Sequence, residues 1–178
     1  MIRLFIALPL PSKISSKLAI LNQTISCARA IPEHQLHLTL RFIGEVDYLQ
    51  FQEIKAGLSE LKHPPFTISV KGVGHFPPRG NPKVIWAGID PQDEVRHLRN
   101  RVNKILRQCN VEPKQRKFYP HITLARLKNS SPQKIKNFLE LNSLLQSPPF
   151  VIDKCCLFSS QLHHDGAKHT IENEYFLR

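Results

Sequence analysis

The sequence predicts an α+β fold in which a β-α-β-α-β unit is used twice and one further strand follows. Stretches with strand-like alternation of apolar residues lie between stretches with helical periodicity. The phrase His-x-Thr-Leu occurs at 37–40 and again at 121–124, an offset of 121 − 37 = 84 residues. We therefore expect a single domain over 1–178, with an internal repeat over roughly 1–76 and 83–160 and a C-terminal hairpin strand over 168–177.

The first half of the chain shows strand and helix patterns in turn. Alternating apolar residues predict strands, and apolar residues three or four positions apart predict helices. The expected elements are strands over 1–9, 36–43 and 66–76, and helices over 12–25 and 47–61. Ser12 and Asp47 are the expected N-caps of these helices. Pro64-Pro65 ends the second helix.

The second half repeats this order. The expected elements are strands over 84–89, 119–127 and 150–159, helices over 95–109 and 131–145, and a last hairpin that turns near Asp165-Gly166 and returns through 171–177. Ser131 is the expected cap of the second of these helices, with Pro132 at its first position. Pro-Pro-Phe at 64–66 and at 148–150 lies at the same offset of 148 − 64 = 84, which supports a duplication.

The two His-x-Thr-Leu phrases lie in predicted strands, where residues two apart share a face. His37 and Thr39 therefore point one way, whereas Leu38, Leu40 and Phe42 point into the core. His121 and Thr123 share a face in the same manner. A duplicated fold with approximate two-fold symmetry would turn the two polar faces toward each other across a central cleft.

Two imidazoles and two hydroxyls form a set that can catalyse phosphoryl chemistry without a metal or other cofactor. With an ordinary pKa of about 6.5, one histidine can be neutral and accept a proton while the other is protonated and donates one. The threonine hydroxyls can donate hydrogen bonds to the oxygens of a phosphate. No carboxylate cluster lies beside either phrase, so the sequence does not suggest a metal centre.

The chain resembles the two-histidine phosphoesterase superfamily, and within it the RNA 2',3'-cyclic phosphodiesterases, also called 2'-5' RNA ligases (the LigT-like family). The resemblance runs through the whole chain and is carried by the segments 3–8, 37–45, 76–77, 82–88, 119–126 and 157–160, with Gly166 and a return strand. It implies a bilobal fold, with antiparallel sheets lining a central cleft and helices outside. It further implies that His37 is the proton donor and His121 the proton acceptor. The substrate would be an RNA end, such as that of a tRNA fragment, whose 2',3'-cyclic phosphate is opened to a 2'-phosphate. In that reaction Thr39 and Thr123 would hold the phosphoryl oxygens, and the reverse reaction would join RNA ends 2'-5'.

Two arginines follow the motifs. The family pattern has an arginine at the position of Arg126, which would bind the substrate phosphate together with Thr39 and Thr123. Strict alternation, however, puts this residue on the face opposite His121, so a bulge, a place on the rim or a structural role are all open. Arg41 shares the parity of His37, and solvent exposure and RNA contact are both open for it. The basic segment 114–119 leads into the second motif. Within it Lys117, Phe118 and Tyr119 could contact RNA, or the two aromatics could belong to the core.

The charge balance points to a polyanionic partner. The chain has 25 Lys and Arg against 14 Asp and Glu, a formal net charge of +11, and such a surface attracts RNA. The four cysteines show no Cys-x-x-Cys spacing, which favours reduced thiols and a cytoplasmic protein. No apolar run is long enough for a membrane span. A site built from Cys155, Cys156 and the nearby histidines 163, 164 and 169 fits no zinc pattern. We expect a monomer.

Two other functions compete with this prediction. The same fold and chemistry could act on a small cyclic phosphate, such as a nucleoside 2',3'-cyclic phosphate or a cyclic phosphate of ADP-ribose. Alternatively, the chain could be an RNA-binding module without turnover. Intact His-x-Thr pairs at both positions argue against the module, since it would have little use for both.

Overall fold

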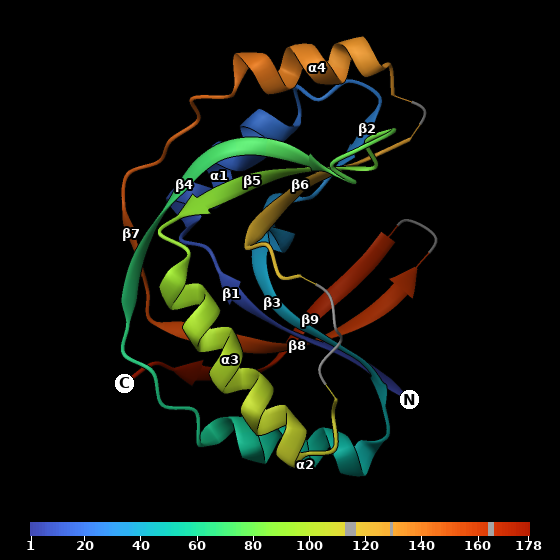
Figure 1. The fold of residues 1–178 in the computed structure, drawn as a ribbon. Helices are drawn as coiled ribbons and strands as arrows, with labels where there is room; N and C mark the ends of the chain where they lie inside the picture. The colour runs from blue at the N-terminus through green and yellow to red at the C-terminus, as the bar shows by residue number, and fades with distance from the viewer. Residues whose placement is uncertain (113–116, 129, 164–165) are drawn as a thin grey trace.

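The strands build one curled antiparallel sheet. The computed structural model describes residues 1–112, 117–128, 130–163 and 166–178. In this part of the chain the strand order is β7-β4-β5-β6-β3-β1-β8-β9, and β2 pairs with β6 off this path (Figure 1). The strands are β1 (Ile2–Pro9), β2 (Ala28–Ala30), β3 (His37–Val46), β4 (Phe66–Phe76), β5 (Val84–Asp90), β6 (His121–Leu127), β7 (Phe150–Ile152), β8 (Lys154–His163) and β9 (Gly166–Phe176).

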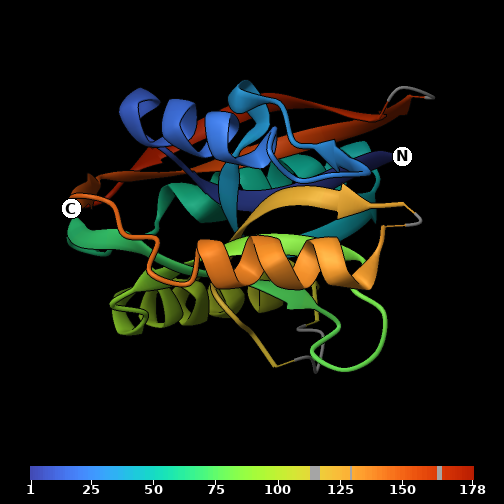
Figure 2. The same cartoon turned by 90° about the horizontal axis from the view of Figure 1, so that it is seen from above.

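The helices lie on the outer side of this sheet (Figures 1 and 2). They are α1 (Ser12–Asn22), η1 (Glu33–Gln35), α2 (Tyr48–Ser59), α3 (Asp93–Gln108) and α4 (Pro132–Leu141). Helices α2 and α3 pack against each other, while α3 also contacts β3 and α1 contacts β6. Together these elements confirm the predicted α+β fold, with an antiparallel sheet and helices outside. In the described residues, no helix is long and apolar enough to cross a membrane.

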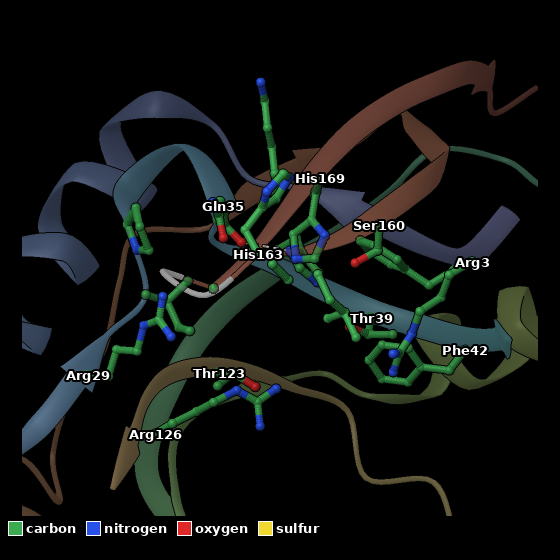
Figure 3. A pocket seen from close by; sticks show the side chains of 18 of the residues that line it. Arg3, Arg29, Gln35, Thr39, Phe42, Thr123, Arg126, Ser160, His163 and His169 are labelled. Atoms are coloured by element: carbon green, nitrogen blue, oxygen red, sulfur yellow. Dashed lines mark hydrogen bonds between the residues drawn. The ribbon is translucent and has the colours of Figure 1, made fainter. Parts of the chain in front are cut away.

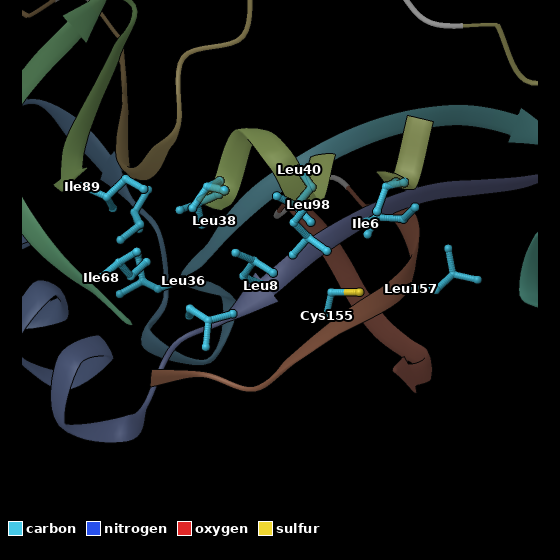
Figure 4. Packing of buried hydrophobic residues seen from close by; sticks show 14 of the residues in the cluster. Ile6, Leu8, Leu36, Leu38, Leu40, Ile68, Ile89, Leu98, Cys155 and Leu157 are labelled. Carbon is cyan, nitrogen blue, oxygen red and sulfur yellow. The ribbon is translucent and has the colours of Figure 1, made fainter. Parts of the chain in front are cut away.

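The hydrophobic core lies between the sheet and the helices. Leu38 and Leu40 of β3 point into it, as alternation predicted, and meet Leu98 of α3 and Leu8 of β1 (Figure 4). All four side chains are buried. Burying a leucine side chain stabilises a fold by roughly 1.5–3 kcal/mol. This packing fixes which face of β3 is left for the polar residues of the motif.

The middle of the sheet is the junction of the two motif strands. Strands β3 and β6 pair only at Leu38 and Ile122 in the described ladder, the apolar residues between the histidine and threonine of each motif. On either side of this junction the order is β6-β5-β4 and β3-β1-β8. Strand β4 of the first expected repeat therefore lies beside β5, and β8 of the second lies beside β1. This order is symmetric about the junction, as a duplication would require, and the duplication itself stays a prediction.

Several helix boundaries differ from those predicted. Pro11, and not Ser12, occupies the N-cap of α1, and the helix ends at Asn22, short of Ile25. Asp47 caps α2 as predicted, since its carboxylate accepts a hydrogen bond from the Gln50 amide at 2.8 Å. Ser131 occupies the N-cap of α4, but its side chain makes no capping bond.

Boundaries later in the chain differ as well. Helix α4 ends at Leu141, so the expected extension to residue 145 is wrong. The strand expected over 150–159 is divided into β7 and β8, which are separated by Asp153. The second motif strand begins at His121 itself and not at residue 119. Gly166 opens β9 with a φ of 128°, whereas Asp165 of the predicted turn lies outside the described residues.

Candidate active site

Both motif histidines are held in the same way. His37 opens β3 and His121 opens β6. The Nδ1 atom of each ring lies 2.7 Å from the backbone oxygen two residues earlier, that of Gln35 for His37 and that of Tyr119 for His121. A carbonyl oxygen can only accept, so Nδ1 carries the proton in both rings. In the neutral ring, Nε2 is then left as the acceptor for a substrate or water.

Burial keeps His37 neutral in the free protein. Its ring stacks on Phe5 at a centroid distance of 5.1 Å and lies 5.9 Å from Phe158 and 5.7 Å from His169. Burial lowers its pKa from 6.5 to about 4; the hydrogen bond to Gln35 opposes this shift, and the charges of His169 and His121 add to it. The charge of His121 is the smallest of these causes, which is consistent with two imidazoles on the same side of the sheet.

Aromatic side chains also surround His121, but they come from strands other than those around His37. Its ring meets Phe76 edge-on at 5.0 Å and Trp86 at 6.3 Å. Burial lowers the pKa of His121, and its hydrogen bond to the Tyr119 carbonyl opposes the shift. Near pH 7 both imidazoles are therefore neutral before a ligand binds.

The two threonines line one cavity together with His37. This cavity has a volume of about 540 Å³, and Figure 3 shows Thr39 and Thr123 among the side chains that line it. Thr39 pairs with Ala7 and Thr123 with Trp86 in the neighbouring strands. His121 is not among the residues that line the cavity, whereas Thr123 and Arg126 of the same strand are. The two hydroxyls and the His37 imidazole are thus arranged around one small volume that could hold a phosphate.

A β-bulge turns Arg126 toward this cavity. In the ladder with β5, Ala125 pairs with Ile85 and Thr123 with Trp86, so Leu124 is an extra residue. Leu124 and Ala125 are consequently both buried, and alternation resumes with the opposite parity. Arg126 therefore lies on the face of His121 and Thr123 and lines the cavity (Figure 3). The bulge decides the question that strict alternation left open.

The first motif strand carries a bulge at the equivalent position. Arg41 pairs with Ile6 and Thr39 with Ala7, so Leu40 is the extra residue, at 124 − 84 = 40. Arg41 is turned away from the cavity, only 5% exposed, and its Nη2 donates to the Glu112 carbonyl. The solvent exposure considered for Arg41 is therefore wrong, and its burial argues against the other role considered, a contact with RNA.

The same bulge turns Phe42 toward the cavity, whereas it turns Arg41 away from it. It was predicted to point into the core, but it is 57% exposed and lines the cavity. Phe42 thus occupies in β3 the place that Arg126 occupies in β6. The prediction failed because one extra residue reverses the side-chain parity of everything that follows it.

Sequence reasoning missed several cavity residues from distant parts of the chain. His163, Ser160 and His169 come from β8 and β9, Phe5 from β1 and Arg29 from β2. Phe5 and Ser160 lie in segments that carry the family resemblance, but no role was assigned to them, and no pattern in the sequence marked Arg29, His163 or His169 as cavity residues. His163 and His169 had been considered with Cys155 and Cys156, but both cysteines are buried in the core. In the described residues, no group of three or more His, Cys, Asp or Glu side chains is arranged to hold a metal ion.

The segment before the second motif is divided between core and surface. Phe118 packs against the core beneath Arg99, whose guanidinium lies 4.4 Å from the ring centroid. Tyr119 is 39% exposed, and its ring centroid lies 4.9 Å from that of Trp86. Lys117 is exposed, and residues 114–116 lie outside the described part of the chain. These positions favour the core alternative for Phe118, while RNA contact by Lys117 and Tyr119 stays a prediction.

Two inward-facing His-x-Thr pairs on adjoining strands of a curled antiparallel sheet define a two-histidine phosphoesterase. The chain belongs to the 2'-5' RNA ligase superfamily, whose family model matches residues 16–164. The family resemblance seen in the sequence is thereby confirmed.

Known relatives and structures agree with this assignment. The chain is 35% identical over 134 residues to an RNA 2',3'-cyclic phosphodiesterase of Archaeoglobus fulgidus, covering 74% of this chain and 76% of the relative. It is 30% identical over 190 residues to one of Thermus thermophilus, covering 99% and 90%. The fold matches the crystal structure of the Thermus thermophilus protein TT0787 with a TM-score of 0.83 at 26% identity, covering 99% and 98% of the two chains.

Proposed function

We propose that this protein is an RNA 2',3'-cyclic phosphodiesterase that opens a terminal 2',3'-cyclic phosphate to a 2'-phosphate by acid-base catalysis between two histidines. The observation that carries the proposal is the equivalent anchoring of His37 and His121. Each Nδ1–H is committed to a backbone carbonyl, so each Nε2 is presented for proton transfer. The names of the relatives from Archaeoglobus fulgidus and Thermus thermophilus support the same reaction.

The reaction needs one proton accepted and one donated. His121, neutral because burial lowers its pKa, takes a proton from water as the water oxygen attacks phosphorus. His37 gives a proton to the departing 3'-oxygen, so the P–O3' bond breaks and a 3'-hydroxyl and a 2'-phosphate are formed. Thr39 and Thr123 donate hydrogen bonds to the non-bridging oxygens. Reversal exchanges the two histidine roles and gives 2'-5' joining of RNA ends.

The low pKa of His37 requires that the substrate itself brings about protonation. An anionic phosphate within a few ångströms favours the charged imidazolium. His37, with a pKa of about 4 in the free protein, therefore takes up its proton when the cyclic phosphate binds. Because the pKa of His37 is low in the free site, the protonated ring becomes a strong acid again when the phosphate charge moves to the leaving oxygen. This property suits the role of proton donor.

An RNA oligonucleotide ending in a 2',3'-cyclic phosphate tests the reaction. In the presence of a chelator, the wild-type protein is expected to produce a 2'-phosphate end, and His37→Ala and His121→Ala are expected to lower kcat by about 100-fold or more. His97→Ala, which removes an exposed histidine of α3, is the matched control and should keep full activity. Full activity in either motif variant would contradict the proposal. Binding without conversion would indicate an RNA-binding module, and a rate that depends on metal would indicate a different mechanism.

The assignment of donor and acceptor has its own test. A substrate with sulfur in place of the 3'-oxygen has a leaving group that needs no proton. This substrate should restore activity to His37→Ala but not to His121→Ala. The reverse pattern would exchange the two roles while leaving the two-histidine chemistry in place.

The same proposal covers the kind of substrate, the location of the protein in the cell and its oligomeric state. A net charge of +11 and a cavity lined with cations support RNA ends, including those of tRNA fragments, over small cyclic phosphates. A monomer in the cytoplasm is the form we propose. Comparable kcat/KM values for nucleoside 2',3'-cyclic phosphates and for RNA would favour the small-molecule alternative.

A further inference from the structure

The carbonyl groups that hold the two motif histidines are themselves fixed in different ways. The acceptor for His37 is the carbonyl of Gln35, which lies in η1, a turn closed by backbone hydrogen bonds. The acceptor for His121 is the carbonyl of Tyr119. Residues 117–119 belong to no helix or strand, and none of them makes a backbone hydrogen bond to another part of the described chain. Side chains therefore have to fix the carbonyl that orients His121.

Arg96 of α3 binds the backbone directly before this acceptor. Its Nη1 donates to the Phe118 carbonyl at 3.0 Å, and its Nη2 donates to Oε1 of Gln92 at 2.7 Å. Gln92 occupies the N-cap of the same helix. Both arms of the planar guanidinium are engaged, so its orientation is fixed. Arg96 thereby ties the peptide group between Phe118 and Tyr119 to the beginning of α3.

Arg99, three residues further along α3, holds the side chain of the same residue. Its guanidinium lies 4.4 Å from the centroid of the Phe118 ring, where a cation is attracted to the face of the aromatic system. Phe118 also packs against the hydrophobic core. Two arginines of one helix thus fix both the backbone and the side chain of the residue that precedes Tyr119.

These arginines lie close to each other and to Arg41, although like charges repel. Burial lowers the pKa of Arg99, and the charge of Arg96 lowers it further; burial and the charge of Arg99 do the same to Arg41. In the part of the chain that the structure describes, none of the three forms an ion pair with a carboxylate. Such a cluster costs electrostatic free energy. What its members have in common is a bond to the chain before the second motif, since Arg41 donates to the Glu112 carbonyl.

We propose that Arg96 and Arg99 are positioning residues for His121. By fixing Phe118 they hold the Tyr119 carbonyl, which keeps the proton of the neutral His121 ring on Nδ1 and leaves Nε2 free to accept a proton from water. Without such an anchor an imidazole is divided between two tautomers, and in the other one Nε2 already carries the proton. The proposal rests on the proposed function, in which His121 is the proton acceptor, and adds to it two residues that do not line the cavity.

The tautomer of His121 tests the proposal without any turnover. At about pH 8 both motif rings are neutral, because burial lowers the pKa of each, and the nitrogen chemical shifts report which nitrogen carries the proton. Arg96→Met should change His121 from the Nδ1–H form to a mixture, and Arg99→Leu should act in the same direction. His37 should keep its Nδ1–H form in the same spectrum, which makes it an internal control for the fold. Arg96→Lys, which keeps a donor, should restore most of the Nδ1–H form, and Arg107→Met, at an exposed position of the same helix, is the matched control and should change nothing.

Kinetics on a substrate with a 2',3'-cyclic phosphate give a second measurement. In Arg96→Met kcat should fall about tenfold to a hundredfold, the cost of a displaced catalytic group, and Arg96→Lys should recover most of it. KM should change little, because the residues that line the cavity are unaltered. An unchanged His121 tautomer in both Arg96→Met and Arg99→Leu, or an equal change at His37, would overturn the positioning role. Failure of the wild type to open any cyclic phosphate would instead overturn the proposed function.

Discussion

His169 meets His37 edge-on, with the ring centroids 5.7 Å apart. The contact joins β9 to the first motif strand and puts a third imidazole beside the expected proton donor. A positive charge on His169 disfavours protonation of His37 and is one cause of its low pKa, after burial itself. The acidity of the first motif histidine therefore depends on a strand far away in the sequence.

Replacement of His169 should raise the pKa of His37. In His169→Gln the repulsion from the neighbouring imidazolium is absent, while most of the side-chain volume is kept, so the pKa should move from about 4 toward 6.5. NMR titration of the His37 ring protons measures the shift. His97→Gln is the control, and an unchanged or lower pKa in His169→Gln would contradict the coupling.

The pH dependence of kcat/KM should have its maximum below pH 6.5. Catalysis needs one protonated and one neutral histidine, and burial lowers the pKa of both in the free protein. As pH rises above the higher of these values, the singly protonated form is lost, so kcat/KM should fall about tenfold per pH unit. Stopped-flow or initial-rate measurements between about pH 4 and pH 9 would check this. A maximum near pH 8 would show that the free histidines are not shifted downward.

Phosphate binding should be accompanied by proton uptake. An anion near His37 raises its pKa, so at about pH 6 the complex should hold more protons than the free protein. Calorimetric titration of inorganic phosphate or of adenosine 2'-phosphate in buffers of different ionisation enthalpy measures the number of protons taken up. Proton release, or none taken up beyond that of the ligand alone, would contradict this role of His37.

Loss of either motif hydroxyl should slow the reaction without loss of fold. Thr39→Val and Thr123→Val keep the shape of the side chain and remove the donor to the phosphoryl oxygen, so kcat/KM should fall about tenfold to a hundredfold. Thr→Ser at the same positions should retain most activity. Thr67→Val, an exposed position of β4, is the control, and equal rates in all variants would remove the threonines from the site.

Trp86 provides a test of the packing beneath His121. A Cβ atom at Gly74 would collide with Cζ2 of Trp86, so Gly74→Ala should displace the indole, the only tryptophan in the chain. The free energy of unfolding should fall by about 1–3 kcal/mol, as in other overpacked sites. Urea denaturation followed by tryptophan fluorescence reports both the new environment and the stability. An unchanged emission spectrum together with unchanged stability would contradict the close packing.

Patterns within short segments predicted much of the fold and the centre of the site. Alternation placed His37 with Thr39 and His121 with Thr123, and the structure brings both pairs to the same side of the sheet. The Asp47 cap also followed from local chemistry. These features were predictable because each depends on residues that are neighbours in the chain, so their geometry is set by backbone sterics and local hydrogen bonds.

The parity of Arg41, Phe42 and Arg126 was decided only by the tertiary structure. It depends on bulges whose position is set by the register with β1 and β5, and no local pattern encodes the register of a distant strand. The approach of Arg29 and His169 to the motif histidines has the same origin. The sequence by itself determined which side chains could carry out the chemistry. The long-range pairing of β2 with β6 and of β9 with β8, which follows from the burial of the core, decided which further residues surround them.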